Sequence, residues 1–241
     1  MNNLKKTRNN LLKIIHDSNK RHIDEKRRYQ LNRDIEIYVK DKPPKSVDMN
    51  KIIALIRDNI PALFLKKLKS VKIGQFDILK KRGISALHKD GHIYIDNNQD
   101  GEKNIIDDFV HEIAHCVEEQ FSEDLYEDQK IINEFLGKRN RLFDLLKNDE
   151  KDYDLNYFDF LNIDYDDEFD DLLYKKIGYK KIENLAPTLF VRAYGATSLR
   201  EYFATAFESY YLHGEDSMKD ISPQVYKKII QFEKLSDFNP K

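Results

Sequence analysis

Apolar residues recur every three or four positions between residues 105 and 121, which is the period of a helix. The apolar stripe covers most of the helix circumference, so we predict a long helix that is buried on nearly all sides. Its apolar members are Ile105, Ile106, Phe109, Val110, Ile113, Ala114, Cys116, Val117 and Phe121.

The same period predicts further helices on both sides of this segment. It covers residues 125–147 on the C-terminal side. On the N-terminal side it covers residues 3–16, 20–39, 48–58 and 60–69. We therefore expect a chain that is mostly helical.

A second pattern, in which apolar and polar residues alternate, lies between these helices. Residues 76–79, 84–87 and 92–96 are typical of short strands, and Asp90-Gly91 has the chemistry of a tight hairpin turn. We predict an α+β fold with a small mixed sheet before the buried helix.

The strand just before the buried helix is also a candidate peptide-binding element. Proteins commonly hold an extended peptide by pairing it with the free edge of a sheet. Ile93, Tyr94 and Ile95 are therefore our candidates for substrate binding.

Two adjacent prolines in the segment 41–45 make the clearest break in the chain. They predict a boundary between a basic helical arm, residues 1–42, and a larger domain, residues 43–241. Residues 1–90 carry 23 Lys and Arg against 10 Asp and Glu, whereas residues 91–241 carry 18 against 33. The two halves either attract each other, or the basic half steers the chain toward an acidic partner such as nucleic acid or a membrane surface.

Composition narrows the class of protein. The 241 residues are 40% hydrophobic and 35% charged, which is typical of a soluble chain with a substantial core. No apolar run is long enough to span a bilayer, and no secretory signal peptide follows Met1. A single cysteine, Cys116, excludes an internal disulfide framework. We expect a cytoplasmic protein, or one exported or translocated without a classical signal peptide.

Residues 149–171 are unusual, because they combine 11 acidic residues and one lysine with six Tyr or Phe. Disordered acidic segments are usually poor in aromatic residues. Two interpretations remain: a surface that recognises basic substrates, or an acidic insert packed on the rest of the chain.

The buried helix contains the sequence His111-Glu112-Ile113-Ala114-His115. Histidines four residues apart project from one face of a helix, so both imidazoles can bind one metal ion, usually zinc. The intervening Glu112 then lies where it can take a proton from a metal-bound water. Zinc binding by His111 and His115 is therefore our central hypothesis.

A second possible cation site is the polar segment from Asp96 to Asp107, which has the D-x-N-x-D-G spacing of a calcium loop. Asp107 stands in the twelfth position, where a bidentate Glu is usual. A strand also precedes the loop where a helix is usual, so an ordinary polar turn is the favoured interpretation.

A catalytic zinc site requires a third protein ligand. Glu118 and Phe121 stand where metzincins have a Gly and the third His, which excludes that class. Glu134 lies at the distance at which thermolysin-like enzymes place a ligand Glu, but the rest of that motif is missing.

The segment from Tyr194-Gly195 to Phe207, with Glu201-Tyr202-Phe203-Ala204 at its centre, carries a more specific likeness. Together with residues 92–96, 105–121 and 190–235 it resembles the catalytic domain of anthrax lethal factor and the related Pro-Pro endopeptidases. The resemblance implies a zincin-like fold, with Glu201 as third ligand and Tyr194 as a catalytic tyrosine. The interval from His115 to Glu201 is longer than in that family.

Two carboxylates near this segment have alternative roles. Glu201 is also the fourth residue of Ser198-Leu199-Arg200-Glu201, which is a helix capping box. Glu208, two turns further along, either orients a ligand histidine from behind or lies on the surface.

The resemblance implies a zinc metalloendopeptidase, of the kind found among toxins and effectors, with one Zn²⁺ per chain. It would cleave a protein or peptide substrate with a Glu-activated zinc-bound water, and nucleic acid is not an expected partner. The alternative is a non-catalytic binding or regulatory module whose basic helical arm binds an acidic partner or nucleic acid.

Overall fold

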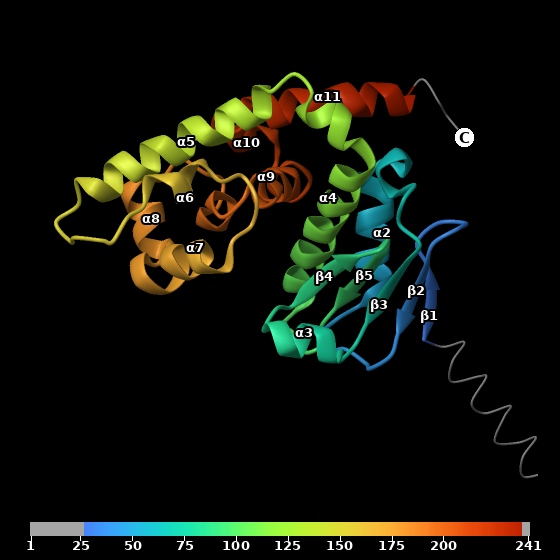
Figure 1. Cartoon of the computed structure of the whole chain (residues 1–241). Coiled ribbons are helices and arrows are strands. Elements are labelled where there is room, and N and C mark those ends of the chain that lie inside the picture. The colour runs from blue at the N-terminus through green and yellow to red at the C-terminus, as the bar shows by residue number, and fades with distance from the viewer. Residues whose placement is uncertain (1–26, 238–241) are drawn as a thin grey trace, which may run out of the picture.

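The structure, a computed structural model, describes residues 27–237 as an α+β fold (Figure 1). The helix expected over residues 3–16 lies outside the described residues. The strands are β1 (Arg28–Gln30), β2 (Glu36–Val39), β3 (Ser70–Ile73), β4 (Ala86–Lys89) and β5 (His92–Ile95). The longer helices are α2 (Met49–Asn59), α4 (Glu102–Tyr126), α5 (Lys130–Lys147), α9 (Leu199–His213) and α11 (Pro223–Asp237). The shorter ones are η1 (Ala62–Leu65), α3 (Asp77–Arg82), α6 (Tyr157–Leu161), α7 (Asp167–Asp171), η2 (Leu172–Ile177), α8 (Tyr179–Leu185), η3 (Ala193–Ala196) and α10 (Glu215–Ile221).

The strands form one mixed sheet, in the order β1-β2-β3-β5-β4. The three central strands run parallel, and the two edge strands are antiparallel to their neighbours. The register places Ile37, Val71 and Ile93 side by side, and all three are fully buried. β-Branched residues fit this position because they pack well on a pleated surface. The predicted small mixed sheet is thus present.

The turn between β4 and β5 follows from its two residues. Asp90 and Gly91 both have positive φ, 54° and 80°, as a tight hairpin turn with two left-handed residues requires. A Cβ at position 91 would lie 2.8 Å from the backbone oxygen of Lys67, so a glycine also fits the space best. The hairpin predicted from the sequence is confirmed.

Three local predictions are wrong. Residues 60–69 contain only the short turn η1 instead of a helix. Residues 28–30 and 36–39 form β1 and β2 instead of the end of a helix over 20–39, because Ile35, Ile37 and Val39 alternate and all point into the core. β2 pairs with β3, so these residues belong to the sheet of the larger domain and not to a separate helical arm. Residues 76–79 begin the helix α3, which ends at the left-handed Gly83.

The peptide-binding edge predicted on residues 93–95 is also wrong. β5 pairs with β3 on one side and with β4 on the other, and Ile93 and Ile95 are fully buried. The backbone of β5 therefore has no free edge. β4 is the edge strand on this side of the described sheet.

α4 lies between the sheet and the helical half of the molecule (Figure 1). One side of it packs on β4, β5 and α2, and another packs on α9. The ring of Phe64 in η1 lies against Phe121, Phe207 and Phe232, at centroid distances of 5.6–6.4 Å, where α4, α9 and α11 meet. α4 is therefore buried on most sides, as its sequence predicts.

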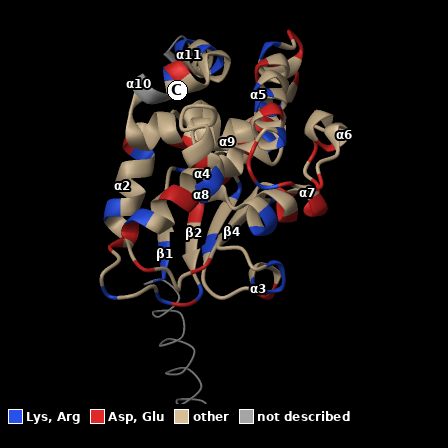
Figure 2. Cartoon of the chain, turned by 90° about the vertical axis from the view of Figure 1, so that its left-hand side faces the viewer, with Lys and Arg blue, Asp and Glu red and all other residues tan. Residues whose placement is uncertain are grey.

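The acidic aromatic segment 149–171 packs on α5. Phe160 of α6 and Phe169 of α7 are buried, whereas most of its Asp and Glu residues are exposed. Figure 2 shows these acidic residues in red around α6 and α7. The segment is thus an ordered part of the fold whose apolar rings anchor it. Within the described part of the chain, none of the helices has the length and apolarity needed to cross a membrane.

Candidate metal and catalytic site

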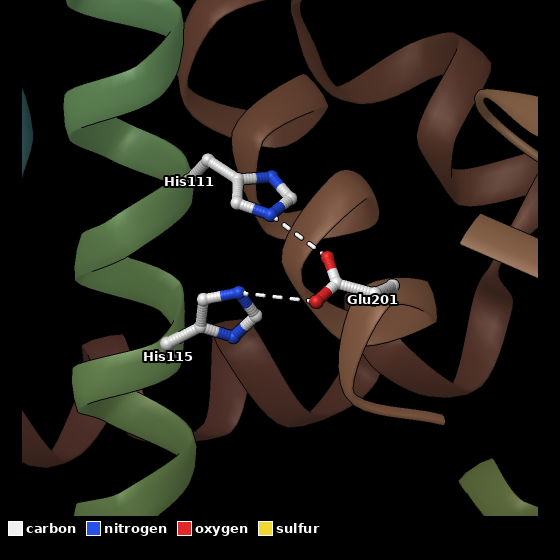
Figure 3. Close-up of side chains that lie close together, drawn as sticks. All are labelled: His111, His115 and Glu201. Atoms are coloured by element: carbon white, nitrogen blue, oxygen red, sulfur yellow. Dashed lines mark hydrogen bonds and ion pairs between the residues drawn. The ribbon is translucent and has the colours of Figure 1, made fainter. Parts of the chain in front are cut away.

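Three potential metal ligands meet where α4 packs on α9. His111 and His115 project from one face of α4, and Glu201 faces them from the first turn of α9 (Figure 3). His111 Nε2 lies 2.9 Å from Glu201 Oε2, and His115 Nε2 lies 3.5 Å from Glu201 Oε1. One ligand atom from each residue lies within 4.8 Å of the other two. The arrangement has the donor set and the size of a metal site.

The start of α9 explains the position of Glu201. Ser198 caps the helix, and its Oγ accepts a hydrogen bond of 3.2 Å from the Glu201 backbone N–H. The cap puts Glu201 in the first turn, where its carboxylate interacts with the two imidazoles. The capping function of Ser198 and a ligand function of Glu201 are therefore compatible.

A carboxylate lies behind His111. Glu208, which is almost completely buried, accepts a hydrogen bond from His111 Nδ1 at 3.3 Å. Arg192 donates to the other oxygen of Glu208 at 2.5 Å and so holds this carboxylate in place. A proton on Nδ1 leaves the lone pair of Nε2 for a metal, which is the usual arrangement behind a metal-binding histidine.

A cation lies behind His115. Arg200 Nε donates to His115 Nδ1 at 2.9 Å, and this arginine nitrogen is also 3.5 Å from Glu118 Oε2. Metal binding through His115 Nε2 requires the ring proton on Nδ1, so Arg200 would then have to pair with Glu118 alone. Glu118 is held nearby by a hydrogen bond of 2.6 Å from the Tyr126 hydroxyl.

These neighbours shift the pKa values of the two histidines in opposite directions. Burial lowers the pKa of His111, but the carboxylates of Glu201 and Glu208 more than reverse this effect and raise it to about 10. Burial and nearby positive charge hold the pKa of His115 well below its usual range. These shifts favour a protonated imidazole at His111 and a neutral imidazole at His115.

Glu112 lies beside the three potential ligands. Its side chain is largely buried, and its Oε2 accepts a hydrogen bond of 2.5 Å from the backbone N–H of His88 in β4. Burial raises the pKa of Glu112 to about 7. A carboxyl group with a pKa near the working pH exchanges protons efficiently in both directions.

Tyr194 lies in the η3 turn that precedes α9. Its ring centroid is 6.2 Å from that of His111 and 6.0 Å from that of Tyr179. Burial and the nearby Glu201 carboxylate raise the pKa of Tyr194 well above its usual value. The hydroxyl group therefore keeps its proton at neutral pH and remains a hydrogen-bond donor.

His111, Glu112, Tyr194, Arg192 and Glu208 line a cleft of about 770 Å³. The lining also includes Ser85 and Ala86, the residue before β4 and its first residue. The acidic aromatic segment and η2 form a further part of the lining, the acidic wall, through Tyr165, Asp167, Asp170, Asp171 and Tyr174. The segment 149–171 is therefore both packed on α5 and exposed to this cleft.

The other sequence candidates lie elsewhere. Glu134 accepts hydrogen bonds from the Tyr202 hydroxyl at 2.8 Å and from the Gln224 backbone N–H at 3.1 Å, away from the two histidines. Asp96 Oδ1 accepts hydrogen bonds from Gln75 and Asn98. Among residues 27–237 the loop 96–107 brings no three His, Cys, Asp or Glu side chains together, so the structure gives the calcium hypothesis no support.

Sequence reasoning missed three arginines, Arg192, Arg200 and Arg139. The first two act on Glu208 and His115, and the third binds the η3 turn. No sequence pattern marks them, because each reaches its partner through tertiary packing.

Comparisons with known proteins add no relative: no family model, curated protein or solved structure matches this chain. The resemblance to the lethal factor family therefore remains a prediction based on the motifs around His111 and Glu201.

Proposed function

We propose that this protein is a zinc-dependent endopeptidase. The observation that carries the proposal is the position of the Glu201 carboxylate between the imidazoles of His111 and His115, although Glu201 follows His111 by 90 residues. Two imidazole nitrogens and one carboxylate oxygen form a common ligand set of catalytic zinc, which leaves a coordination position for water or substrate.

The ligand set and the carboxylate behind His111 fit zinc, whereas Arg200 would have to pair with Glu118 and release His115 Nδ1. Glu208 accepts a hydrogen bond from His111 Nδ1, so Nε2 of the same ring is oriented toward Glu201. When bound, zinc would lower the pKa of a coordinated water and polarise the carbonyl of the peptide bond.

The proton transfers are assigned to Glu112. It would take a proton from the attacking water and later donate it to the departing amine. Its pKa of about 7 suits both steps, and its hydrogen bond to the His88 backbone N–H fixes one carboxylate oxygen while the other is available.

The assigned hydrogen-bond donor is Tyr194. Negative charge develops on the carbonyl oxygen during attack, and a donor aimed at that oxygen stabilises the transition state more than the substrate. Support for Tyr194 comes from its place in the cleft, its neighbouring His111 ring and its retained proton.

A substrate strand would pair with β4 and not with β5. Asp96 N–H donates to Ser85 O at 2.7 Å, which makes these two residues a hydrogen-bonded pair of the antiparallel ladder. Along an antiparallel ladder, hydrogen-bonded and non-hydrogen-bonded residue pairs alternate. The backbone N–H and C=O groups of Ala86 and His88 therefore point away from β5. The His88 N–H is already bonded to Glu112, which leaves Ala86 as the first position for an extended peptide.

The test is zinc content, measured by mass spectrometry on the wild type and the Glu201→Ala variant. We expect about one zinc per wild-type chain, as a single three-ligand site would bind, and a large loss in Glu201→Ala. Glu134→Ala is the control, since it also removes a partly buried, hydrogen-bonded carboxylate but should retain zinc. Stoichiometric zinc that is indifferent to Glu201 would contradict the ligand assignment. A zinc-free wild type would favour the alternative of a non-catalytic binding or regulatory module.

A further inference from the structure

Arg139, in the middle of α5, is fully buried although its side chain is charged. Burying a guanidinium is unfavourable unless hydrogen bonds and other charges replace its hydration. Every hydrogen bond found for it here goes to a backbone carbonyl: Nη1 donates to Ala196 O at 2.8 Å and to Thr197 O at 3.3 Å, and Nη2 donates to Asp159 O. A residue needed only to fill this core position would be apolar.

Three aromatic rings surround the guanidinium. Its central carbon lies 4.0 Å from the ring centroid of Phe169, 5.3 Å from that of Phe135 and 5.7 Å from that of Phe160. Ring faces attract a cation and partly replace the lost water. Phe160 and Phe169 belong to the segment 149–171, so Arg139 joins this segment to η3.

Two of the three carbonyls that Arg139 binds, those of Ala196 and Thr197, lie between Tyr194 and Glu201 in the chain. Thr197 donates to Tyr194 O from both its backbone N–H, at 3.0 Å, and its Oγ1, at 2.8 Å, so the turn from Tyr194 to Thr197 is closed on itself. The next residue, Ser198, caps α9 and fixes Glu201. Restraining Ala196 and Thr197 therefore restrains Tyr194 directly, whereas Glu201 keeps the cap of its own helix.

The segment 149–171 also contacts the turn directly. Leu199 N–H donates to Ile163 O at 2.9 Å, immediately after the Ser198 cap. Gly195 permits the close packing of the turn on α9, because a Cβ there would lie 2.6 Å from Thr205 Oγ1. The turn is thus in contact with the segment 149–171, with α9 and with Arg139.

We infer that Arg139 is a positioning residue that fixes residues 194–198 and acts on the reaction through Tyr194. The inference rests on the proposed role of Tyr194 as hydrogen-bond donor. Arg139 itself lies in the core, where its guanidinium is enclosed by carbonyls and rings and is not offered to substrate.

The first test does not depend on activity. Hydrogen–deuterium exchange is compared for the backbone amides of Gly195, Thr197 and Leu199. All three N–H groups lie in the turn or just after it, and each donates a hydrogen bond. In the wild type, local opening of the turn must also break the hydrogen bonds to Arg139. Arg139→Met removes this cost, so we expect these exchange rates to rise by about tenfold or more. Ile37→Ala in β2, which removes a fully buried side chain far along the sheet, is the control for general loss of stability. Equal exchange in both variants at equal loss of thermal stability would overturn the inference.

The second test measures cleavage of a quenched-fluorescent peptide library by the zinc-loaded protein. We expect Arg139→Met to lower kcat by about 10–100-fold, the range that follows from small misplacement of a catalytic group, with KM and zinc content unchanged. In a Tyr194→Phe background the same substitution should change kcat by less than about twofold, because coupled residues are not additive. An additive loss would show that Arg139 acts through general stability.

Arg139→Lys keeps the positive charge, but its single nitrogen does not reproduce the two-nitrogen fork that binds these carbonyls, so it serves in both tests if the methionine variant does not fold. It should give effects in the same direction and smaller. A wild type that binds no zinc or cleaves no peptide removes the proposed function, whereas the exchange measurement still decides whether Arg139 fixes the turn.

Discussion

α4 and α9 both contribute to the candidate metal site, but they place their residues in different ways. His111 and His115 are four residues apart on one helix, so their mutual geometry is local. Glu201 depends on the Ser198 cap and on the packing of α9 against α4. We conclude that α4 supplies a pair of ligands that is robust to distant changes, whereas the contribution of α9 is sensitive to packing far from the site.

The two histidines also differ in what lies behind them. A carboxylate, Glu208, faces His111, and a guanidinium, Arg200, faces His115. A carboxylate makes an imidazole a stronger ligand, while a nearby cation opposes binding of a second cation. His111 should therefore contribute more to metal affinity than His115, although both lie on the same helix.

The largest effect is expected for Glu112 on α4. Glu112→Gln should lower peptide cleavage by about 10³–10⁴-fold, near the upper end of the range for general acid–base catalysis, while zinc content stays unchanged. Mass spectrometry and cleavage of a peptide library measure the two quantities. Activity retained at full zinc occupancy would remove Glu112 from the mechanism.

The next effect concerns α9 and its preceding turn. Tyr194→Phe should reduce kcat by about 10²–10³-fold, as the loss of one donor to a developing oxyanion typically does, with little change in KM or zinc content. Tyr179→Phe is the matched control, because Tyr179 packs against Tyr194 and donates its hydroxyl to Asp170. Equal losses in both variants would indicate a shared packing effect.

A smaller effect tests the two groups behind the histidines. Glu208→Gln should weaken zinc binding by about 10–100-fold, because His111 loses its charged acceptor. Arg200→Gln should leave zinc affinity unchanged or raise it, because a positive charge near His115 is removed. Competition with a zinc chelator gives both values. A loss in Arg200→Gln as large as that in Glu208→Gln would contradict the difference between the histidines.

The smallest effect concerns the acidic wall of the cleft. Asp167 lines this wall, and Asp167→Asn should slow cleavage of a peptide with a basic residue by about two- to fivefold relative to a neutral peptide of the same length. One charge interacts weakly in a cleft open to water. Asp164→Asn, on the exposed surface of the same segment, is the control. The effect should shrink at high salt, and equal changes for both peptides would remove substrate recognition from this wall.

Much of the fold could be predicted where it depends on local pattern. The apolar period of residues 105–121 predicted α4, and Asp90-Gly91 predicted the hairpin. Strands of three or four residues are harder to predict from sequence. The pattern around β2 favours a helix, and no pattern indicates β3. Their identity comes from pairing with each other, since the sequence between them contains α2 and η1.

The sequence by itself determined that two histidines share one helix face, because the helix period is a property of neighbouring residues. Only the tertiary structure decided which of the 43 acidic residues would face them, and it brought Glu201 to the pair while Glu134 was bonded elsewhere. It also decided that Arg139, one of 41 basic residues, would bind the turn before α9. Such contacts join residues tens of positions apart, and their partners are selected by the packing of whole helices against one another.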